Sequence, residues 1–406
     1  MQTFIVEDLK NTPEGKEANR ILRSCVHCGL CTATCPTYRL LGDELDSPRG
    51  RIYLIKGMLE GREASRKTQL HLDRCLTCRA CETNCPSGVE YGHLLDIGRQ
   101  QIEARIKRSP GDRLFRFVLR KLLPYRRRFL FLLRVGQFLR PVLHGRLKKM
   151  IPVKISTKTS ASGKHSRRMI LFSGCVQPSL APNTNAAAIR VLDKLAISTI
   201  AVHGEGCCGA IDYHMAEINT ARKFMQKNID QWWPYINEDI KAIITTASGC
   251  GAMIKDYGYI LRDDPVYAKK ARQISSMTND ISEIFTNRDI SQLKNKITLN
   301  NERLAFQNPC TLQHGQRLSN TTEDLLFELG FKLTQVPDRD QCCGSAGVYS
   351  LLQPDLSLQL QRKKVNALLT GRPEVIATAN IGCQLHLQQA TDVPVKHWIE
   401  LLDEAC

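Results

Sequence analysis

Eight cysteines near the N-terminus have the types and spacing of iron–sulfur ligands. The pattern C-x2-C-x2-C-x3-C-P occurs twice, over 25–36 and 75–86. Three thiolates at i, i+3 and i+6 can surround one face of a cubane, whereas the fourth ligates the other cluster in two-cluster proteins. We therefore expect two [4Fe-4S] clusters with exchanged fourth ligands. The first set is Cys25, Cys28, Cys31 and Cys85, and the second is Cys75, Cys78, Cys81 and Cys35.

Structural zinc is the alternative occupant of these thiols. Zinc sites usually draw on two separated CxxC pairs, whereas each motif here offers three closely spaced cysteines plus one. The pattern therefore favours clusters. His27 and Arg79, inside the two loops, are expected to face solvent. A cluster pair carries single electrons and does not oxidise an organic substrate alone.

A second group of eight cysteines belongs to an internal repeat. Each copy has one cysteine, a Cys-Cys-Gly and a final cysteine, and the copies are offset by 135, 135, 135 and 133 residues. The two sets are Cys175, Cys207, Cys208 and Cys250, and Cys310, Cys342, Cys343 and Cys383. Each set could hold an iron–sulfur cluster, a zinc ion or a redox dithiol. His314 and His386 either add ligands or form ordinary hydrogen bonds.

The elements around these cysteines indicate two kinds of domain. Short apolar runs before the first and last cysteine of each copy indicate buried strands, and helical patterns lie between them. This alternation predicts α/β domains with mainly parallel sheets, whose sites form just after the strand ends. Helical spacing between and after the N-terminal motifs predicts a helical scaffold. The fold class is therefore α+β and multidomain.

Composition divides the 406 residues into four regions. Residues 1–105 form the cysteine-dense N-terminal domain, and 106–168 form a basic connector that ends in a Ser/Thr/Lys-rich linker. Residues 169–300 and 301–406 are the two repeat domains. The N-terminus has no basic and apolar leader pattern. Thiols in tight CxxC and CC groups are typical of a reducing compartment, which predicts a cytoplasmic protein.

The connector carries the whole charge imbalance of the chain. Residues 113–168 hold 17 Lys and Arg and no Asp or Glu, while the remainder holds 40 basic and 40 acidic residues. Leucine, phenylalanine and arginine recur at helical spacing in 113–150, as in helices that lie on anionic membranes. Docking to an acidic subunit, nucleic-acid binding and a plain solvated face are the alternatives. Nucleic acid is not the expected partner, and no apolar run is long enough to span a bilayer.

The chain resembles the iron–sulfur subunit of bacterial glycolate oxidase (glycolate dehydrogenase) over essentially its full length. The segments that carry the resemblance are 25–56, 71–99, 206–214, 246–255, 342–347 and 377–387. The cysteine motifs alone are shared with subunits for lactate use, glycerol-3-phosphate oxidation and heterodisulfide reduction. In the last group the repeat ends in CxxC, whereas here Cys250 is followed by Met253 and Cys383 by His386.

The resemblance implies one subunit of a larger oxidoreductase. Separate FAD subunits would oxidise glycolate to glyoxylate, and this subunit would pass the electrons to a quinone or another acceptor. The sequence has no convincing flavin or nicotinamide motif, because the G-x-G-x-x-G at 204–209 is not repeated in the second copy. An iron–sulfur subunit of a lactate or glycerol-3-phosphate dehydrogenase is the first alternative. An iron–sulfur nucleic-acid-binding regulator is the second.

Overall fold

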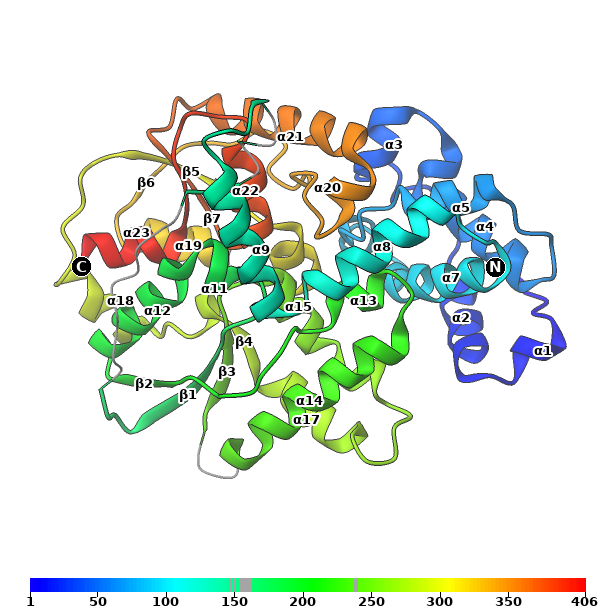
Figure 1. The fold of residues 1–406 in the computed structure, drawn as a ribbon, viewed down its shortest axis with the longest axis horizontal. Helices are drawn as coiled ribbons and strands as arrows, with labels where there is room; N and C mark the ends of the chain where they lie inside the picture. The colour runs from blue at the N-terminus through cyan, green and yellow to red at the C-terminus, as the bar shows by residue number, and fades with distance from the viewer. Residues whose placement is uncertain (146–147, 149–150, 154–162, 237–239) are drawn as a thin grey trace.

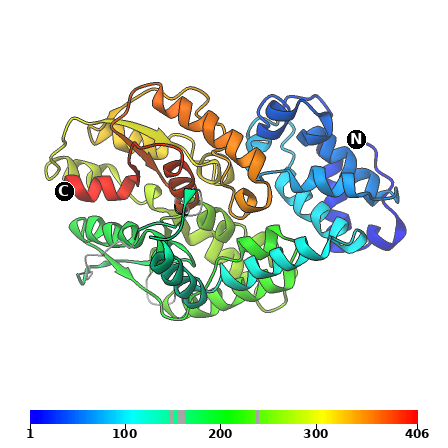
Figure 2. The same ribbon diagram turned by 45° about the horizontal axis from the view of Figure 1, so that its top comes forward.

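The computed structural model describes residues 1–145, 148, 151–153, 163–236 and 240–406. A helical N-terminal domain lies at one end of the molecule, and two sheet-containing domains lie side by side at the other (Figures 1 and 2). Two helices of the connector cross from the first part to the second. The expected α+β multidomain architecture is confirmed. Parts of the connector, at 146–147, 149–150 and 154–162, are outside the described residues.

The N-terminal domain is built from short capped helices. Thr12, Ser47 and Ser65 each accept a backbone N–H three residues later, which fixes where three of these helices begin. The elements are α1 (Glu7–Lys10), α2 (Pro13–Ser24), α3 (Pro36–Leu41), η1 (Glu44–Asp46), α4 (Pro48–Leu59), α5 (Arg66–Asp73), α6 (Ala80–Thr83) and α7 (Tyr91–Arg105).

The core of this domain forms where α2, α4, α5 and α7 meet. Leu22, Ile55 and Leu94 are fully buried there. Gly98 of α7 allows the close approach of α4, because a Cβ at this position would lie 2.6 Å from Cγ1 of Ile55. The first cysteine loop precedes α3 and the second contains α6, so this core holds both loops in place.

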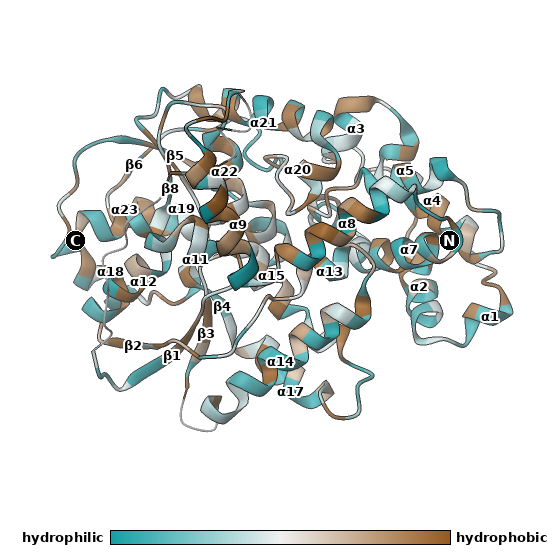
Figure 3. Ribbon diagram, in the orientation of Figure 1, coloured by the Kyte–Doolittle hydropathy of each residue, from teal (hydrophilic) through white to brown (hydrophobic). Residues whose placement is uncertain are grey.

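The basic connector forms two helices on the surface of the first repeat domain. They are α8 (Pro110–Leu122) and α9 (Arg126–Leu139). Arg120 pairs with Glu217, and the ring of Tyr125 packs edge-on against Phe224. The outward face keeps large apolar side chains among arginines, which Figure 3 shows as alternating brown and teal. No helix in the described residues has the length and apolarity needed to cross a membrane.

Each repeat domain contains a four-stranded parallel sheet of the same topology. The first has the order β2-β1-β3-β4 and the second the order β6-β5-β7-β8. The strands are β1 (Arg167–Phe172), β2 (Ile197–Ile200), β3 (Ala242–Thr245), β4 (Thr278–Asp280), β5 (Arg303–Gln307), β6 (Lys332–Leu333), β7 (Val375–Thr378) and β8 (Val395–His397). The four predicted strands are present, and β1 begins inside the segment expected to be a linker.

Helices connect these strands, as parallel pairing requires. The first domain contains α11 (Gln177–Leu180), α12 (Pro182–Lys194), α13 (Ala210–His214), α14 (Ile218–Ile236), α15 (Ser248–Lys255), α16 (Tyr257–Ile260), α17 (Ala268–Met277), η2 (Ile281–Glu283) and α18 (Asn287–Lys294). The second contains η3 (Thr311–Gly315), α19 (Thr321–Glu328), α20 (Tyr349–Leu352), α21 (Pro354–Leu369), α22 (Ile381–Gln388) and α23 (Trp398–Ala405).

The two repeat domains share one hydrophobic core. Met169 and Leu171 on one face of β1 belong to the same buried cluster as Leu304 and Phe306 of β5. Helices α12 and α23, one from each domain, pack against each other within it. The opposite face of β1 has a separate core that contains Trp232. The alternation along β1 therefore divides its side chains between two cores.

Candidate functional site

The first predicted ligand set is gathered around one small cavity. Cys25, Cys28, Cys31 and Cys85 all line it, although Cys85 is distant in sequence. Burial, with Cys25 as the largest charged neighbour, raises the pKa of Cys31 to about 11. Four thiols in this arrangement resist simultaneous ionisation unless a cation neutralises them.

The second predicted set surrounds a neighbouring cavity. Cys35, Cys75, Cys78 and Cys81 line it. Burial raises the pKa of Cys78 and Cys81 well above the usual value for a thiol. Each predicted set thus combines three cysteines of one motif with one of the other around its own cavity. Cys81 also contributes to the wall of the first cavity, so the two cavities adjoin.

Both cysteine loops have the same unusual backbone. The second and fourth residues after the first cysteine have positive φ: 57° at His27 and 83° at Gly29, and 54° at Thr77 and 59° at Arg79. Alternating left-handed residues form concave nests of N–H groups, which bind anions and iron–sulfur clusters. The donors and the backbone therefore both fit an anionic [4Fe-4S] group in each loop.

The repeat cysteines also form two compact groups. In the second repeat, Sγ of Cys310 lies 3.8 Å from Sγ of Cys342, and Sγ of Cys343 lies 3.1 Å from Sγ of Cys383. These four cysteines are buried. Cys310 and Cys383 follow the carboxyl ends of β5 and β7, which are neighbours in the sheet. The parallel sheet thus brings together residues far apart in sequence.

The first repeat has the equivalent group. Hydrogen bonds from Cys207 and Cys250 lower the pKa of Cys208 well below the usual value for a thiol. The pKa of Cys207 is raised, chiefly by its hydrogen bond with Cys175. The backbone N–H of Ala210 also lowers the pKa of Cys208. This donor set fits a soft metal ion or cluster, which binds thiolates and displaces their protons.

Two histidines beside the second group form hydrogen bonds. Nδ1 of His314 lies 2.9 Å from Oγ1 of Thr83 in the N-terminal domain. Nε2 of His386 lies 3.2 Å from Oγ of Ser357. Both contacts fit the hydrogen-bonding role that was weighed from the sequence.

The two cysteine regions face each other across a domain interface. Figure 1 shows α13, α15 and α20, each adjacent to repeat cysteines, on the side toward the N-terminal domain. Cys78 packs in one apolar cluster with Cys310, Cys342 and Tyr349. The Tyr349 hydroxyl donates to the carbonyl of Arg74 at 3.0 Å. The second repeat group is therefore adjacent to the second N-terminal group.

Arg79 does not face solvent as expected. Its Nη2 lies 2.5 Å from Oδ2 of Asp256 in the first repeat domain, and its side chain is only 14 % exposed. Arg79 lowers the pKa of Asp256 against the opposing effect of burial. The expectation was wrong because the loop docks on another domain, which local sequence does not reveal. His27 is half-buried against the ring of Tyr53.

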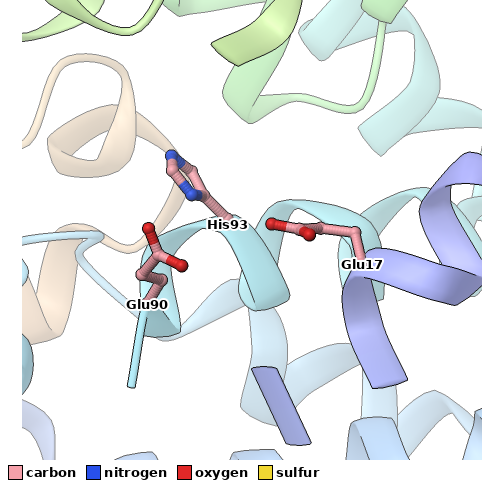
Figure 4. A group of neighbouring side chains, drawn as sticks. All are labelled: Glu17, Glu90 and His93. Atoms are coloured by element: carbon pink, nitrogen blue, oxygen red, sulfur yellow. The ribbon is translucent and has the colours of Figure 1, made fainter. Parts of the chain in front are cut away.

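Other side chains of ligand type also come together in the N-terminal domain. Glu17 of α2 and Glu90 and His93 at the start of α7 lie near one another (Figure 4). Arg20 already pairs with both carboxylates, so a cation is present without a metal. A similar group around Asp46 is also paired with arginines.

Comparisons with known proteins agree with this geometry. Residues 21–89 match the family described as 4Fe-4S dicluster domain, and 169–255 and 304–388 match the family described as cysteine-rich domain. The chain is therefore an iron–sulfur protein of the electron-transfer class, with one dicluster domain and two cysteine-rich domains. These cysteine-rich domains are the repeat domains described above.

Relatives that match over the full length identify the family within this class of proteins. The chain is 50 % identical to the glycolate oxidase iron-sulfur subunit of Escherichia coli over all of this chain and 99 % of the relative. It is 30 % identical to the probable glycolate oxidase iron-sulfur subunit of Bacillus subtilis, over 95 % of this chain and 94 % of the relative. The protein belongs to the family of glycolate oxidase iron-sulfur subunits. Lactate utilization protein A of Bacillus subtilis is 24 % identical over 58 % of this chain.

Proposed function

We propose that this chain is the iron–sulfur electron-transfer subunit of a multi-subunit glycolate dehydrogenase. The observation that carries the proposal is the full-length similarity to the Escherichia coli subunit, together with cysteines in both motif types. Oxidation of glycolate to glyoxylate releases two electrons and two protons. FAD on partner subunits would take the pair, and the two [4Fe-4S] clusters would accept electrons singly before they reach a quinone or another acceptor.

The proposal includes the two crossed ligand sets in the dicluster domain. Their support is the pair of adjoining cavities: each is lined by all four cysteines of one proposed set, and Cys81 of the second set also touches the first cavity. It also includes the domain limits 1–105, 106–168, 169–300 and 301–406, and the eight repeat cysteines as ligands of a further cluster or metal. The packing of Cys78 with Cys310 and Cys342 supports a route from the second cluster toward the second repeat group.

Anaerobic co-purification tests the proposed function. The chain is expressed with the flavoprotein subunits from the same genome, and iron and FAD are counted in the complex. Glycolate should bleach the visible absorbance of the clusters within the complex, and lactate or glycerol 3-phosphate should not. Bleaching by lactate or glycerol 3-phosphate alone would favour the first alternative. A chain that purifies alone and binds DNA in a salt-dependent way would replace the proposal.

Single cysteine substitutions test the ligand sets. Cys35→Ser should remove the cluster of Cys75, Cys78 and Cys81, and Cys85→Ser should remove the other one. Each variant should lose about four irons per chain while the other paramagnetic signal persists. Cys406→Ser is the matched control because that thiol lies far from both cavities, and it should keep the full iron content. Loss of both signals in equal proportion from either variant would contradict the crossed assignment.

We further propose that α8 and α9 make a peripheral contact with the cytoplasmic face of an anionic membrane. The face exposes Phe131 and Phe138, at 66 % and 84 %, beside the exposed Arg126–Arg128. Apolar rings with arginines suit insertion at the headgroup level.

Flotation with vesicles that contain phosphatidylglycerol tests this contact. A Phe131→Ser/Phe138→Ser variant should float at a reduced fraction, whereas Phe327→Ser, at an equally exposed site in α19, should float like the wild type. Equal flotation of all three proteins would remove the membrane contact from the proposal.

A further inference from the structure

Arg51 of α4 is an arginine with no exposed surface, which is rare for an isolated cation. It lines the cavity of the second ligand set. Its Nη1 lies 3.9 Å from Sγ of Cys35, and its Nη2 lies 3.1 Å from Oγ1 of Thr37. Its Nε donates to the carbonyl of His71 at 2.7 Å. The guanidinium is therefore fixed in orientation, with one nitrogen directed at a proposed cluster ligand.

The positive charge of Arg51 beside this cavity is only partly neutralised. Asp46, also fully buried, lies 3.3 Å from Nη2 of Arg51. The same carboxylate accepts Nη1 of Arg74 at 2.8 Å and contacts Nδ1 of His71 at 3.0 Å. Two permanent cations thus share one anion. The cation closer to the thiols is Arg51.

The first cavity lacks such a buried cation among the described residues. Its nearby arginine, Arg49, has a side chain that is 39 % exposed and pairs with Glu44. Solvent screens a charge in that position. Hydrogen bonds to sulfur follow the same asymmetry. Cys35 is 3.3 Å from the Thr37 hydroxyl.

The remaining hydrogen bonds to sulfur favour the second set as well. Cys75 receives the N–H of Thr77 at 3.5 Å and the hydroxyl of Tyr91 at 3.7 Å. In the first set, Cys85 receives the N–H of Val89 at 3.4 Å and Cys25 receives the N–H of His27. Of these two sets, only the second receives hydrogen bonds to sulfur from other side chains among the described residues.

We propose that Arg51 makes the cluster of Cys35, Cys75, Cys78 and Cys81 the one with the higher reduction potential. Reduction adds one negative charge, and cluster potentials rise with nearby positive charge and with hydrogen bonds to sulfur. A buried cation acts strongly because little solvent screens it. The electron then resides on the cluster adjacent to the second cysteine-rich domain. This inference rests on the ligand sets of the proposed function.

The test is a redox titration of the purified full-length protein, followed by its paramagnetic signals. Arg51→Gln should lower the midpoint potential of one cluster by at least a tenfold change in equilibrium constant, about 59 mV for one electron. That cluster should be the one lost in Cys35→Ser. Arg51→Lys should shift it less, and Asp46→Asn should shift it upward. Arg49→Gln, on the same helix but with a side chain that is 39 % exposed, is the control and should leave the potential of this second cluster unchanged.

Iron counting distinguishes a failure of the proposed ligand sets from a failure of the proposed role of Arg51. A wild-type dicluster domain that holds fewer than eight irons would sink the ligand sets themselves. Eight irons with potentials that ignore Arg51→Gln would overturn the role of Arg51 alone. If the Arg51→Gln protein loses iron, the potential of the Asp46→Asn protein becomes the deciding measurement. A purely structural role of Arg51 predicts no upward shift of the cluster potential in Asp46→Asn. An unchanged or lowered potential in Asp46→Asn overturns the inference.

Discussion

His397 is a buried histidine that joins the two cysteine-rich domains. Its Nε2 donates to the carbonyl of Thr246 at 2.8 Å, and its Nδ1 accepts the N–H of Ile399 at 3.2 Å. Burial lowers the pKa of His397 to about 3. A proton on Nδ1 would remove the acceptor that Ile399 uses. The folded protein therefore keeps this ring neutral.

Acid should weaken the fold through this residue. Below about pH 6.5 the unfolded chain binds a proton at His397 that the folded chain refuses, down to about pH 3. The contribution to the free energy of unfolding should fall by about 2 kcal/mol between pH 7 and pH 5. His397→Asn should lose that dependence, and exposed His203→Asn should retain it. Urea unfolding followed by tryptophan fluorescence measures this, and equal pH slopes in all three proteins would contradict it.

At the level of single residues, the grouping of the cysteines could be predicted better than the side chains that surround them. All sixteen paired-motif cysteines could be singled out from spacing alone. Arg51 and Arg79 could not, because the first looks like part of a polar helix face and the second like a loop tip. Each acquires its role from contacts with distant segments, Cys35 and Asp256 respectively. An arginine within the apolar spacing of α4 was the one local signal.

The loop that follows β6 contains two glycines with positive φ, Gly344 and Gly347. Gly344 has φ of 89°, and a Cβ there would lie 2.5 Å from the carbonyl oxygen of Ser357 in α21. Gly347, also at positive φ, has open space around it. Comparing these two positions therefore distinguishes the cost of a left-handed backbone from the cost of a steric clash.

Alanine substitutions at both positions should therefore differ in effect. Gly347→Ala should lower the free energy of unfolding by about 1 to 2 kcal/mol, the cost of left-handed backbone. Gly344→Ala should cost between about 2 and 4 kcal/mol, because overpacking against α21 is added. Urea unfolding read from Trp398, in the same domain, distinguishes them. Similar losses of unfolding free energy in the two variants would show that α21 shifts to accommodate the added methyl group.

Most elements were predictable because their patterns are local. The strands β1, β3, β5 and β7 and the helices α4 and α12 match the apolar spacing closely. Edge strands were harder. Strand β6 has two residues and β8 three, so neither has enough length to show a period. Their positions follow from the sheet and not from their own composition.

The whole molecule depends on contacts between domains, and the ion pair Arg79–Asp256 is one of the charged contacts. Replacing Asp256 by Asn leaves the largely buried Arg79 without its carboxylate. We expect a loss on the order of 2 kcal/mol, below the value for a fully buried pair because both partners retain some exposure. Arg79→Met with Asp256→Leu should recover much of the loss. Asp263→Asn, in an exposed pair, should have no measurable effect.

Two optical probes report this loss separately. The visible absorbance of the clusters follows the N-terminal domain, and the three tryptophans all lie in the cysteine-rich domains. Thermal transitions by the two probes should coincide in the wild type and separate in Asp256→Asn. Coincident transitions in that variant would show that this ion pair does not couple the domains.

The arrangement of domains could not be predicted from the sequence. The offsets of the repeat indicated two similar domains, but similarity says nothing about whether they touch. The shared core places Met169 and Leu304, which are 135 residues apart in sequence, in one buried cluster. Only the folded chain reveals that the two domains share this core.

Because α12 packs against α23, the first cysteine-rich domain cannot complete its core while the chain is still being synthesised. Helix α12 stays uncovered on this face until α23 has been synthesised. At 5–20 residues per second, that delay is on the order of 10–40 s. Cys175, Cys207 and Cys208 belong to the other core, on the opposite face of β1, which is built from residues of the first domain alone. Burial of this first group of repeat thiols therefore does not depend on α23, and iron and sulfide have to reach them before the shared core is complete.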